Sequence, residues 1–400
     1  MHVLGLLHNF VKKSCVGVHS KRLKTVCKVV ESLMFGGKLT IAGLGRSLKT
    51  GAKTKHNIKR ADRLVGNKKL HKERFEFYKN AANCIISDTK KPLLIIDWSS
   101  LPDPNFYLLR ASVPTHGRAM TIYEEIHPKK KLNNHRIHKL FLNKLKSLVP
   151  EGCRPITVTD AGFHSPFFRE VEQLDWNWVG RIRNLTKYRG LTSDIWFHCK
   201  KLYKKATRIP KFIDEVVLSK STPIQCSLFL FKDKKKGRID KNQSGKRRRN
   251  KASKDLAKTN KEPWVLATSL KGGNKIAKNI VRIYKARMQI EEGFRDIKNS
   301  RFGFGFEETL THDAKRLENL LLIGMLAILV TTLLGKAGER RRLQFDYQAN
   351  TIRNRTVLSA FFLGCQILRK GQIDFSKNEL DQALKELISS LNKWEDINLC

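Results

Sequence analysis

The spacing of apolar positions changes along the chain and predicts a different element type in each part. Over about the first eighty residues they recur at helical spacing, as in "KRLKTVCKVVESLMF", which stops at Gly36-Gly37. From Pro92 the runs become strand-like: "PLLIID", "FYLLRASV" and "MTIYEEI" predict three consecutive strands. The first is so uniformly apolar that we expect a central strand covered on both faces.

The next segments predict an α/β domain. An amphipathic helix over 136–149 is followed by buried strands in "PITVTDAGF" and in "WNWVGRIR" (176–183). Together with the first three strands they indicate a mixed sheet with flanking helices. Between about 182 and 263 the apolar segments are short and β-like. They end in a basic run over 232–262, which we expect to be a mobile loop. The sequence therefore predicts a β-rich insertion, after which "WVLATSL" resumes the core.

The last part of the chain is predicted to be helical. The segment 317–335 has an uncharged apolar part of about fifteen residues, short of the roughly 20 needed to span a membrane. It opens with Glu318 and Asn319, so we expect a helix buried in a large core. Further on, Ser376 and Glu379 form a capping-box pattern, and Phe375 and Leu380 a hydrophobic staple. A stripe then follows: Leu380, Leu384, Leu387, Leu391 and Trp394. Both the chain's own core and a partner subunit fit this stripe.

The charge balance points to a polyanionic partner. The chain has 79 Lys and Arg residues against 36 Asp and Glu residues, a formal net charge of +43. Such an excess suits the neutralisation of backbone phosphates and favours nucleic acid over a solvated basic surface. A membrane-surface role is less favoured because no lipidation motif is present.

The cysteines and the N-terminus indicate a soluble cytoplasmic protein without a membrane partner. The eight cysteines are scattered and form no C-x-x-C pair, which argues against a structural zinc site and a disulfide framework. In "MHVLGLLHNFVKK" the charges follow a very short apolar run, the reverse of a signal peptide.

A basic helix near the N-terminus is a candidate DNA reader. In "TKHNIKRADRLVG" the apolar positions Ile58 and Leu64 are expected to face inward. The residues left to point outward are Lys53, Lys55, His56, Asn57, Lys59, Arg60 and Arg63. A helix-turn-helix-like DNA-binding domain has this appearance. The alternative is a small helical bundle with a solvated basic face.

Three acids are candidate metal ligands. Asp97 and Asp160 each end a strongly apolar strand, where ligand sites gather in α/β sheets, although a lone carboxylate there often caps a turn. Glu291 lies on the helix predicted over 283–298. Carboxylate oxygens suit Mg²⁺, and two such ions can support phosphodiester displacement.

Helical geometry separates Glu291 from its neighbour Glu292. If 283–298 is one helix at about 100° per residue, Glu291 shares a stripe with Tyr284, Arg287 and Lys298, whereas Glu292 points about 100° away. The stripe suits a helix along a phosphate backbone, with Glu291 for metal. The alternative is a surface ladder of ion pairs.

The order Asp97, Asp160, Glu291, with Tyr284-x2-Arg287-x3-Glu291-x6-Lys298, resembles the signature of cut-and-paste DDE transposases of bacterial insertion sequences, the Tyr-Arg-Glu-Lys group. Further segments are similar to members of that group: "TKHNIKRADRL", "LHKERF", "IDWS", "LRASV", "TDAGF", "EPWVLATSL" and "NTIRNRTVLS". The resemblance implies an RNase H-like α/β core with a mixed sheet, interrupted by a β-rich insertion. It also implies two Mg²⁺ ions, which Mn²⁺ can replace, held by Asp97, Asp160 and Glu291.

The resemblance also implies a reaction series. An activated water nicks one strand, the freed 3′-OH closes a DNA hairpin on the opposite strand, and hydrolysis reopens the hairpin before strand transfer into target DNA. Tyr284, Arg287 and Lys298 would bind DNA phosphate. By position, Trp264 matches an aromatic that stacks on a flipped base and Met288 matches a wedge in the gap, although Trp264 also suits a core position.

The resulting expectation is a DNA transposase in three parts: a helical DNA-end-binding domain over 1–85, a catalytic core over 86–335 with its insertion over about 182–263, and a helical C-terminal region over 336–400, where dimerisation is one candidate role. Its partners would be its terminal inverted repeats, target DNA and a second copy of itself in a paired-ends complex, in a nucleoid-associated bacterial setting. The alternatives are another RNase H-like nuclease, such as a junction resolvase, and a non-catalytic basic DNA-binding protein.

Overall fold

The computed structural model describes residues 17–87, 89–115, 117–234, 262–349, 351–371 and 373–392, together with residue 5 and the positions 246–248, 250–251, 253–254 and 257. The chain divides into two compact units. The first combines Met1–Cys153 with Met288–Asp396, and the second combines Arg154–Arg287 with Ile397–Cys400. The core of the first unit is therefore built from two distant parts of the sequence.

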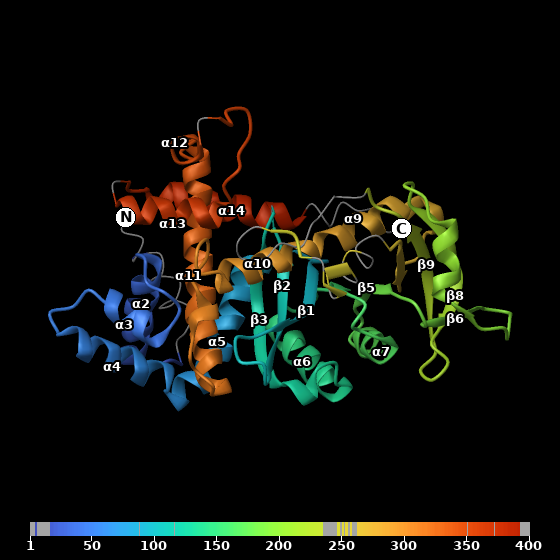
Figure 1. Ribbon diagram of the computed structural model, residues 1–400, viewed down its shortest axis with the longest axis horizontal. Coiled ribbons are helices and arrows are strands. Elements are labelled where there is room, and N and C mark those ends of the chain that lie inside the picture. Colours follow the sequence, from blue (N-terminus) through green and yellow to red (C-terminus); the bar gives the residue numbers. More distant parts are fainter. Residues whose placement is uncertain are drawn as a thin grey trace. The chain divides into compact units, whose positions relative to one another are not determined.

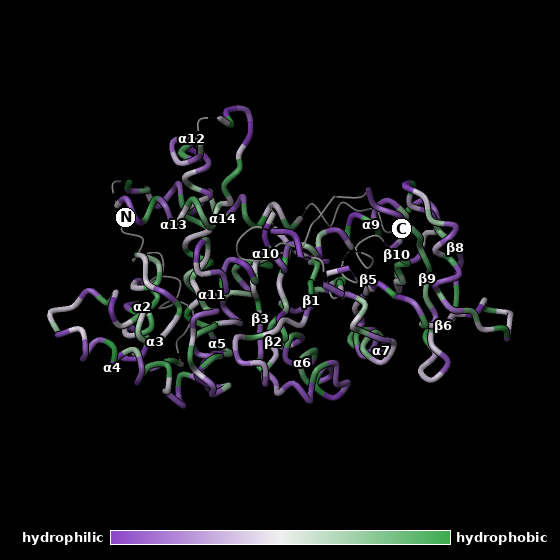
Figure 2. Tube along the Cα trace, viewed as in Figure 1, coloured by the Kyte–Doolittle hydropathy of each residue, from purple (hydrophilic) through white to green (hydrophobic). Residues whose placement is uncertain are grey.

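Four helices open the first unit: α2 (Ser20–Met34), α3 (Ile41–Ser47), α4 (Thr54–Val65) and α5 (Lys68–Ile86). Thr40 caps α3 by accepting from the Gly43 amide, and Asn67 caps α5 by accepting from two amides. The helices α3 and α4 pack tightly, because a Cβ on Gly45 would lie 2.3 Å from the Ile58 Cα. Figure 2 shows α4 as largely hydrophilic. The predicted N-terminal helices are confirmed.

Three antiparallel strands form the sheet of this unit, in the order β3-β2-β1: β1 (Leu93–Ser100), β2 (Phe106–Pro114) and β3 (Ala119–Pro128). All three strands expected from the sequence are present, although β1 continues to Ser100, beyond the expected run that stopped at Asp97. Leu93–Ile96 are almost fully buried. Helix α6 (His135–Leu148) follows as expected and begins at the side-chain cap Asn134. Helix α10 (Met288–Lys298) contacts all three strands (Figure 1).

The helix α11 (Ala314–Arg340) is the centre of the first unit. It is long and apolar enough to cross a membrane by length and composition, but nearly all of its apolar window is buried against the protein. Helices α2, α5, α13 (Ala360–Lys370) and α14 (Lys377–Asn392) contact it (Figure 1). The expectation of a buried core helix is confirmed. The short helix α12 (Gln344–Tyr347) connects α11 to α13.

The C-terminal helix α14 packs on its own subunit. Ser376 and Glu379 exchange the two reciprocal hydrogen bonds of a capping box, at 2.8 and 3.3 Å, as the sequence predicts. Leu380, Leu387 and Leu391 are at most 2% exposed, and α14 contacts α11 and α5. The choice left open by the sequence is therefore settled for these positions, while Trp394 lies outside the described residues.

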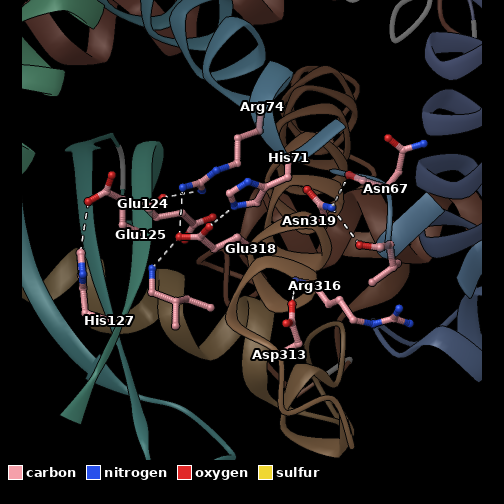
Figure 3. Close-up of polar contacts among 12 residues, drawn as sticks. Asn67, His71, Arg74, Glu124, Glu125, His127, Asp313, Arg316, Glu318 and Asn319 are labelled. Atoms are coloured by element: carbon pink, nitrogen blue, oxygen red, sulfur yellow. Dashed lines mark hydrogen bonds and ion pairs between the residues drawn. The ribbon is translucent and has the colours of Figure 1, made fainter. Parts of the chain in front are cut away.

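One acidic side chain at the start of α11 joins three elements (Figure 3). The Glu318 carboxylate accepts a hydrogen bond from the Ile126 amide of β3 at 2.9 Å. It also pairs with Arg74 of α5 at 3.0 Å and with His71 at 2.5 Å. The Asn319 amide donates to the Val65 carbonyl at 2.8 Å. These contacts hold the N-terminal helices and the sheet to α11.

The second unit contains a seven-stranded mixed sheet in the order β4-β5-β10-β9-β8-β6-β7. Its strands are β4 (Ile156–Thr159), β5 (Asn177–Ile182), β6 (Lys187–Gly190), β7 (Phe197–His198), β8 (Lys211–Leu218), β9 (Ile224–Phe231) and β10 (Trp264–Thr268). Among the described strands of this unit, β4 and β5 pair in parallel and the other pairs are antiparallel. Helices α7 (Ser165–Gln173) and α9 (Ala277–Ala286) complete the unit.

The mixed α/β class is confirmed, and the expected β-rich segment forms strands β6 to β9. Two features were not expected. Helix α7 connects β4 to β5, and the segment after β7 forms a 3-10 helix over Cys199–Lys205. The short apolar pair Phe167-Phe168 gave little helical periodicity, although His164-Ser165-Pro166 is a helix-start pattern. Most of the basic run 232–262 lies outside the described residues.

Glu125 in β3 provides a test of the buried polar contacts of the first unit. Burial by itself raises the pKa of this carboxyl, but hydrogen bonds from His127, Lys144 and Tyr123 outweigh it and lower the pKa from 4.5 to about 2. A depressed acidic pKa contributes stability that is present above pH 4.5 and lost as the pH falls toward 2.

We expect Glu125→Gln to lower the free energy of unfolding at pH 7 by about 3 kcal/mol, from roughly 1.4 kcal/mol per pKa unit. The difference from the wild type should shrink as the pH falls below 4.5. Urea unfolding at pH 7, 5 and 3.5 measures it. The control is Glu76→Gln, an exposed glutamate on α5. A loss that stays constant with pH would contradict the assignment.

Candidate active site and nucleic-acid interface

The candidate residues come from both units. The first unit contains Asp97, Met288, Glu291 and Lys298, and the second contains Asp160, Trp264, Tyr284 and Arg287. The candidate DNA-binding residues of α4 belong to the first unit.

Asp97 is a half-buried acid inside β1, which continues to Ser100, so the expectation that Asp97 ends its strand is wrong. Its Oδ1 accepts a hydrogen bond from the Trp98 amide at 2.9 Å, which fixes the side-chain rotamer. Lys298 of α10 is close enough for Asp97 to act on it electrostatically, and its ammonium donates to the Ser99 hydroxyl at 2.6 Å. Asp97 and the C-terminal part of α10 are therefore neighbours on one face of the sheet.

The Lys298 ammonium is held in an unusual environment. Burial and the nearby guanidinium of Arg110 lower the pKa of Lys298, and Asp97 and Glu307 act in the opposite direction; together they bring it from 10.5 to about 8. The ammonium also lies 5.2 Å from the centre of the Phe294 ring. Lys298 thus remains mainly cationic at neutral pH and bridges α10 to the end of β1.

The prediction of one continuous helix over 283–298 is wrong. Helix α9 ends at Ala286 and α10 begins at Met288, with the two separated by Arg287. The Arg287 amide bonds to the Tyr284 carbonyl, three residues back, instead of four. No proline or glycine marks this change, so the periodicity concealed it. Arg287 itself keeps helical torsion angles, φ -51° and ψ -34°, so the interruption is a single tightened turn, and the common stripe with Glu291 and Lys298 stays a prediction.

Within α10 the separation of the two glutamates holds. Glu291 lies in the first turn and is exposed. Glu292 points elsewhere: it pairs with Arg295 at 2.8 Å and lies 3.7 Å from Arg118. Arg118 also bonds to Asp296 at 2.7 Å. Glu292 is thus part of an ion-pair cluster that fastens α10 to the start of β3.

Asp160 follows β4 directly and begins a turn. Its Oδ1 accepts from the Gly162 amide at 2.8 Å, so the turn-capping role considered for this residue is present. The carboxylate is half-buried, and its Oδ2 has no hydrogen-bond partner among the described residues. A turn cap that uses one oxygen leaves the other for a ligand.

Tyr284 is 4% exposed, which differs from the open position expected for it. It shares a hydrogen bond with Arg287, and burial raises the pKa of its phenol, opposed by Arg287 and Arg181 and reinforced by Asp160. Asp160, Tyr284 and Arg287 therefore lie close together in the second unit.

Trp264 is half-buried at the start of β10. Its ring packs edge-on against Tyr284, with centroids 5.0 Å apart, and lies 5.6 Å from Phe231. Met288 is half-buried as the first residue of α10. Trp264 thus makes the contacts expected of a core residue, and it is also exposed enough to fit the alternative, a residue that stacks on a flipped base.

The basic face of α4 is exposed at six of the seven predicted positions: Lys53, Lys55, His56, Lys59, Arg60 and Arg63. Asn57 is the exception and is 4% exposed. It accepts from the Thr50 hydroxyl at 2.7 Å and donates to the Leu48 carbonyl at 3.1 Å. The expectation that Asn57 points outward is wrong, because it ties the turn between α3 and α4.

A groove of about 440 Å³ lies beside α4 and was not expected from the sequence. Lys59, Arg60 and Arg63 line one side, and Lys21 and Arg22 at the start of α2 line the other. Arg22 is paired with Glu73, so the lysines and the α4 arginines carry the available charge. The groove suits a phosphate backbone.

The predicted metal ligands have side chains of the right chemical type, but the structure does not show them gathered into a metal-binding cluster. Among the residues that the structure describes, no three His, Cys, Asp or Glu side chains are arranged to hold a metal ion. Asp97 and Asp160 each use one carboxylate oxygen for a main-chain amide, which orients the side chain. Three carboxylates are hard oxygen donors of the kind that Mg²⁺ accepts.

Sequence reasoning missed two charged groups close to the candidate acids. Arg110 of β2 lies opposite Asp97 of β1 in the strand register. Arg181 interacts electrostatically with Tyr284. The signal for Arg110 was present: a charge in the middle of the apolar strand "FYLLRASV" requires a buried partner.

Residues 88–330 match the family model described as "Transposase DDE domain". The matched segment covers more than half of the chain and contains Asp97, Asp160 and Glu291. Among curated proteins, none matches the sequence.

Glu292 and its ion pairs provide a test of the α10 geometry. We expect Glu292→Ala to lower the free energy of unfolding by about 0.5–1 kcal/mol, because a partly exposed ion pair contributes in that range. Urea unfolding at low and high salt measures it, and the loss should decrease with salt. Glu76→Ala on α5 is the matched control. An unchanged stability at low salt would show that the cluster does not hold α10.

Proposed function

Because this chain belongs to the DDE transposase family, we propose that it excises an insertion sequence and joins the freed 3′-OH ends to target DNA. Transposases of this family act on DNA and use divalent metal ions. The observation that carries the proposal is the match over 88–330, which contains Asp97, Asp160 and Glu291 in the order of the signature. The net charge of +43 supports a DNA substrate.

In this proposal Asp97, Asp160 and Glu291 are the catalytic carboxylates and hold two Mg²⁺ ions, for which Mn²⁺ can substitute. The bound ions supply activation of the attacking oxygen and stabilisation of the leaving oxygen. The protein contributes orientation: the Trp98 and Gly162 amides fix the Asp97 and Asp160 rotamers. Glu292 has a separate role, because Arg118 and Arg295 engage it.

The proposed reaction is a series at each transposon end on an RNase H-like core. Hydrolysis nicks one strand and leaves a 3′-OH, which attacks the opposite strand to close a hairpin. Hydrolysis then reopens the hairpin, and the 3′-OH is transferred to target DNA. Arg287 and Lys298 bind phosphate, and buried Tyr284 holds Arg287 by their hydrogen bond.

We propose that Trp264 stacks on the base flipped out at the hairpin and that Met288 occupies the gap. The Trp264 ring is partly open and is braced by Tyr284, which gives a fixed platform for stacking. An apolar side chain such as Met288 suits an unstacked base step. The helical segment 1–85 binds the terminal inverted repeats, and two copies meet in the paired-ends complex.

The catalytic assignment is tested by excision of DNA that carries the element's own ends, resolved on a denaturing gel. We expect Asp97→Ala, Asp160→Ala and Glu291→Ala to abolish nicking while end binding in a gel shift remains within about twofold, since these acids bind metal and not sequence. Glu292→Ala is the matched control and should retain most activity.

Each outcome of that assay favours a different function. Hairpin and integration products support the transposase. Nicking of branched DNA with neither product indicates a structure-specific nuclease. End binding without any cleavage indicates a non-catalytic DNA-binding protein. Equal losses in Glu291→Ala and Glu292→Ala would refute the separation of the two glutamates.

The α4 face is tested by the salt dependence of end binding. We expect Lys59→Ala to weaken binding and to reduce the slope of log K against log salt by about 1, since one phosphate contact is lost. Lys146→Ala on α6 is the matched exposed-lysine control. Asn57→Ala should instead lower the free energy of unfolding, because its hydrogen bonds hold the turn before α4. An unchanged slope for Lys59→Ala would exclude contact through α4.

A further inference from the structure

Three charged residues lie side by side across the sheet of the first unit. The strand register pairs Asp97 of β1 with Arg110 of β2, and pairs Arg110 with Glu124 of β3. Directly paired residues project from the same face, with their Cβ atoms about 5 Å apart. Arg110 is thus a cation between two acids, either of which its side chain is long enough to reach.

The structure shows that Arg110 forms its ion pair with Glu124. Its Nε donates to Glu124 Oε2 at 2.7 Å, and its Nη2 lies 2.6 Å from the same oxygen without the alignment of a second hydrogen bond. The guanidinium is therefore drawn toward β3, the side opposite to Asp97. Arg110 is 1% exposed and Glu124 is 0% exposed, so neither charge has water as an alternative partner.

Two aromatic groups hold this arrangement. The Tyr78 hydroxyl donates to the other oxygen of Glu124 at 3.0 Å. The Phe294 ring of α10 lies over the guanidinium, 4.7 Å from its central carbon. Phe294 is three residues from Glu291 on the same helix, so the element that seats on Arg110 also carries a proposed catalytic acid.

We propose that Glu124 is a positioning residue for the metal site: it retains Arg110 on the β3 side and prevents the guanidinium from closing an ion pair with Asp97. This inference rests on the proposed role of Asp97 as a metal ligand. An Arg110–Asp97 pair would compete with a divalent cation for the same carboxylate, because a bidentate guanidinium matches carboxylate geometry closely.

The test is metal binding by the DNA-free protein, measured by Mn²⁺ electron paramagnetic resonance titration and by calorimetry, which is a readout separate from activity. Glu124→Gln removes the anion but keeps the shape, so Asp97 becomes the nearest anion to Arg110. We expect the Kd for Mn²⁺ to rise about 10–100-fold, the range for loss of an outer partner of a ligand. Circular dichroism and urea unfolding verify the fold.

The double variant Arg110→Met/Glu124→Gln removes the competing cation together with its partner. We expect its Kd for Mn²⁺ to return to within about threefold of the wild type, since a buried ion pair can be replaced by neutral groups without loss of the fold. Glu125→Gln is the matched control, because it neutralises the adjacent buried glutamate, which bonds to Tyr123, Lys144 and His127. Its Kd should equal that of the wild type.

Three outcomes would overturn the inference: an unchanged Kd in folded Glu124→Gln, no recovery in the double variant, or an equal rise in Glu125→Gln. If Glu124→Gln does not fold, Glu124→Asp provides the same test. It keeps the negative charge but places it farther from Arg110, because the side chain is shorter by one methylene. A smaller rise in Kd supports the inference and no rise overturns it. Asp97→Ala separates this inference from the proposed function: if it leaves Mn²⁺ binding intact, the metal assignment itself is wrong.

Discussion

A guanidinium without access to water constrains the arrangement of the first unit. Arg110 lies in the middle strand of three, and its charge is tolerated only because Glu124 is beside it and Phe294 covers it. Each partner comes from a different element, and Tyr78 of α5 completes the set. The pair therefore fixes the relation of α5, β3 and α10 to the sheet, and α10 is the helix that carries Glu291.

A second buried acid extends this arrangement to the N-terminal helices. Glu318 bonds to the Ile126 amide of β3, a strand with no further neighbour in the sheet of this unit, and also pairs with Arg74 of α5. The same carboxylate thus covers part of an edge strand and fastens the N-terminal helices. Helix α4, with its basic face, is consequently part of the same packed body as β1 and α10.

Local patterns predicted the elements of this chain well, and long-range pairing explains what they missed. The positions of β1, β2, β3 and α6 follow from runs of apolar residues, and the Ser376–Glu379 capping box follows from four adjacent residues. The break at Arg287 and the inward direction of Asn57 depend on hydrogen bonds that no spacing reveals. Likewise, the sequence placed Asp160 correctly at a strand end, but it could not show that β1 continues past Asp97 or that Arg110 lies opposite Asp97, because register is set by the assembled sheet.

The break at Arg287 also alters how the Tyr-Arg-Glu-Lys signature is understood physically. On a single helix the four residues would form one stripe with a shared orientation. In this structure Tyr284 and Arg287 are held by α9 with Asp160 nearby, while Glu291 and Lys298 are held by α10, where Lys298 contacts β1 beside Asp97. Two of the four residues thus lie near the candidate aspartates: Tyr284 acts electrostatically with Asp160, and Lys298 with Asp97.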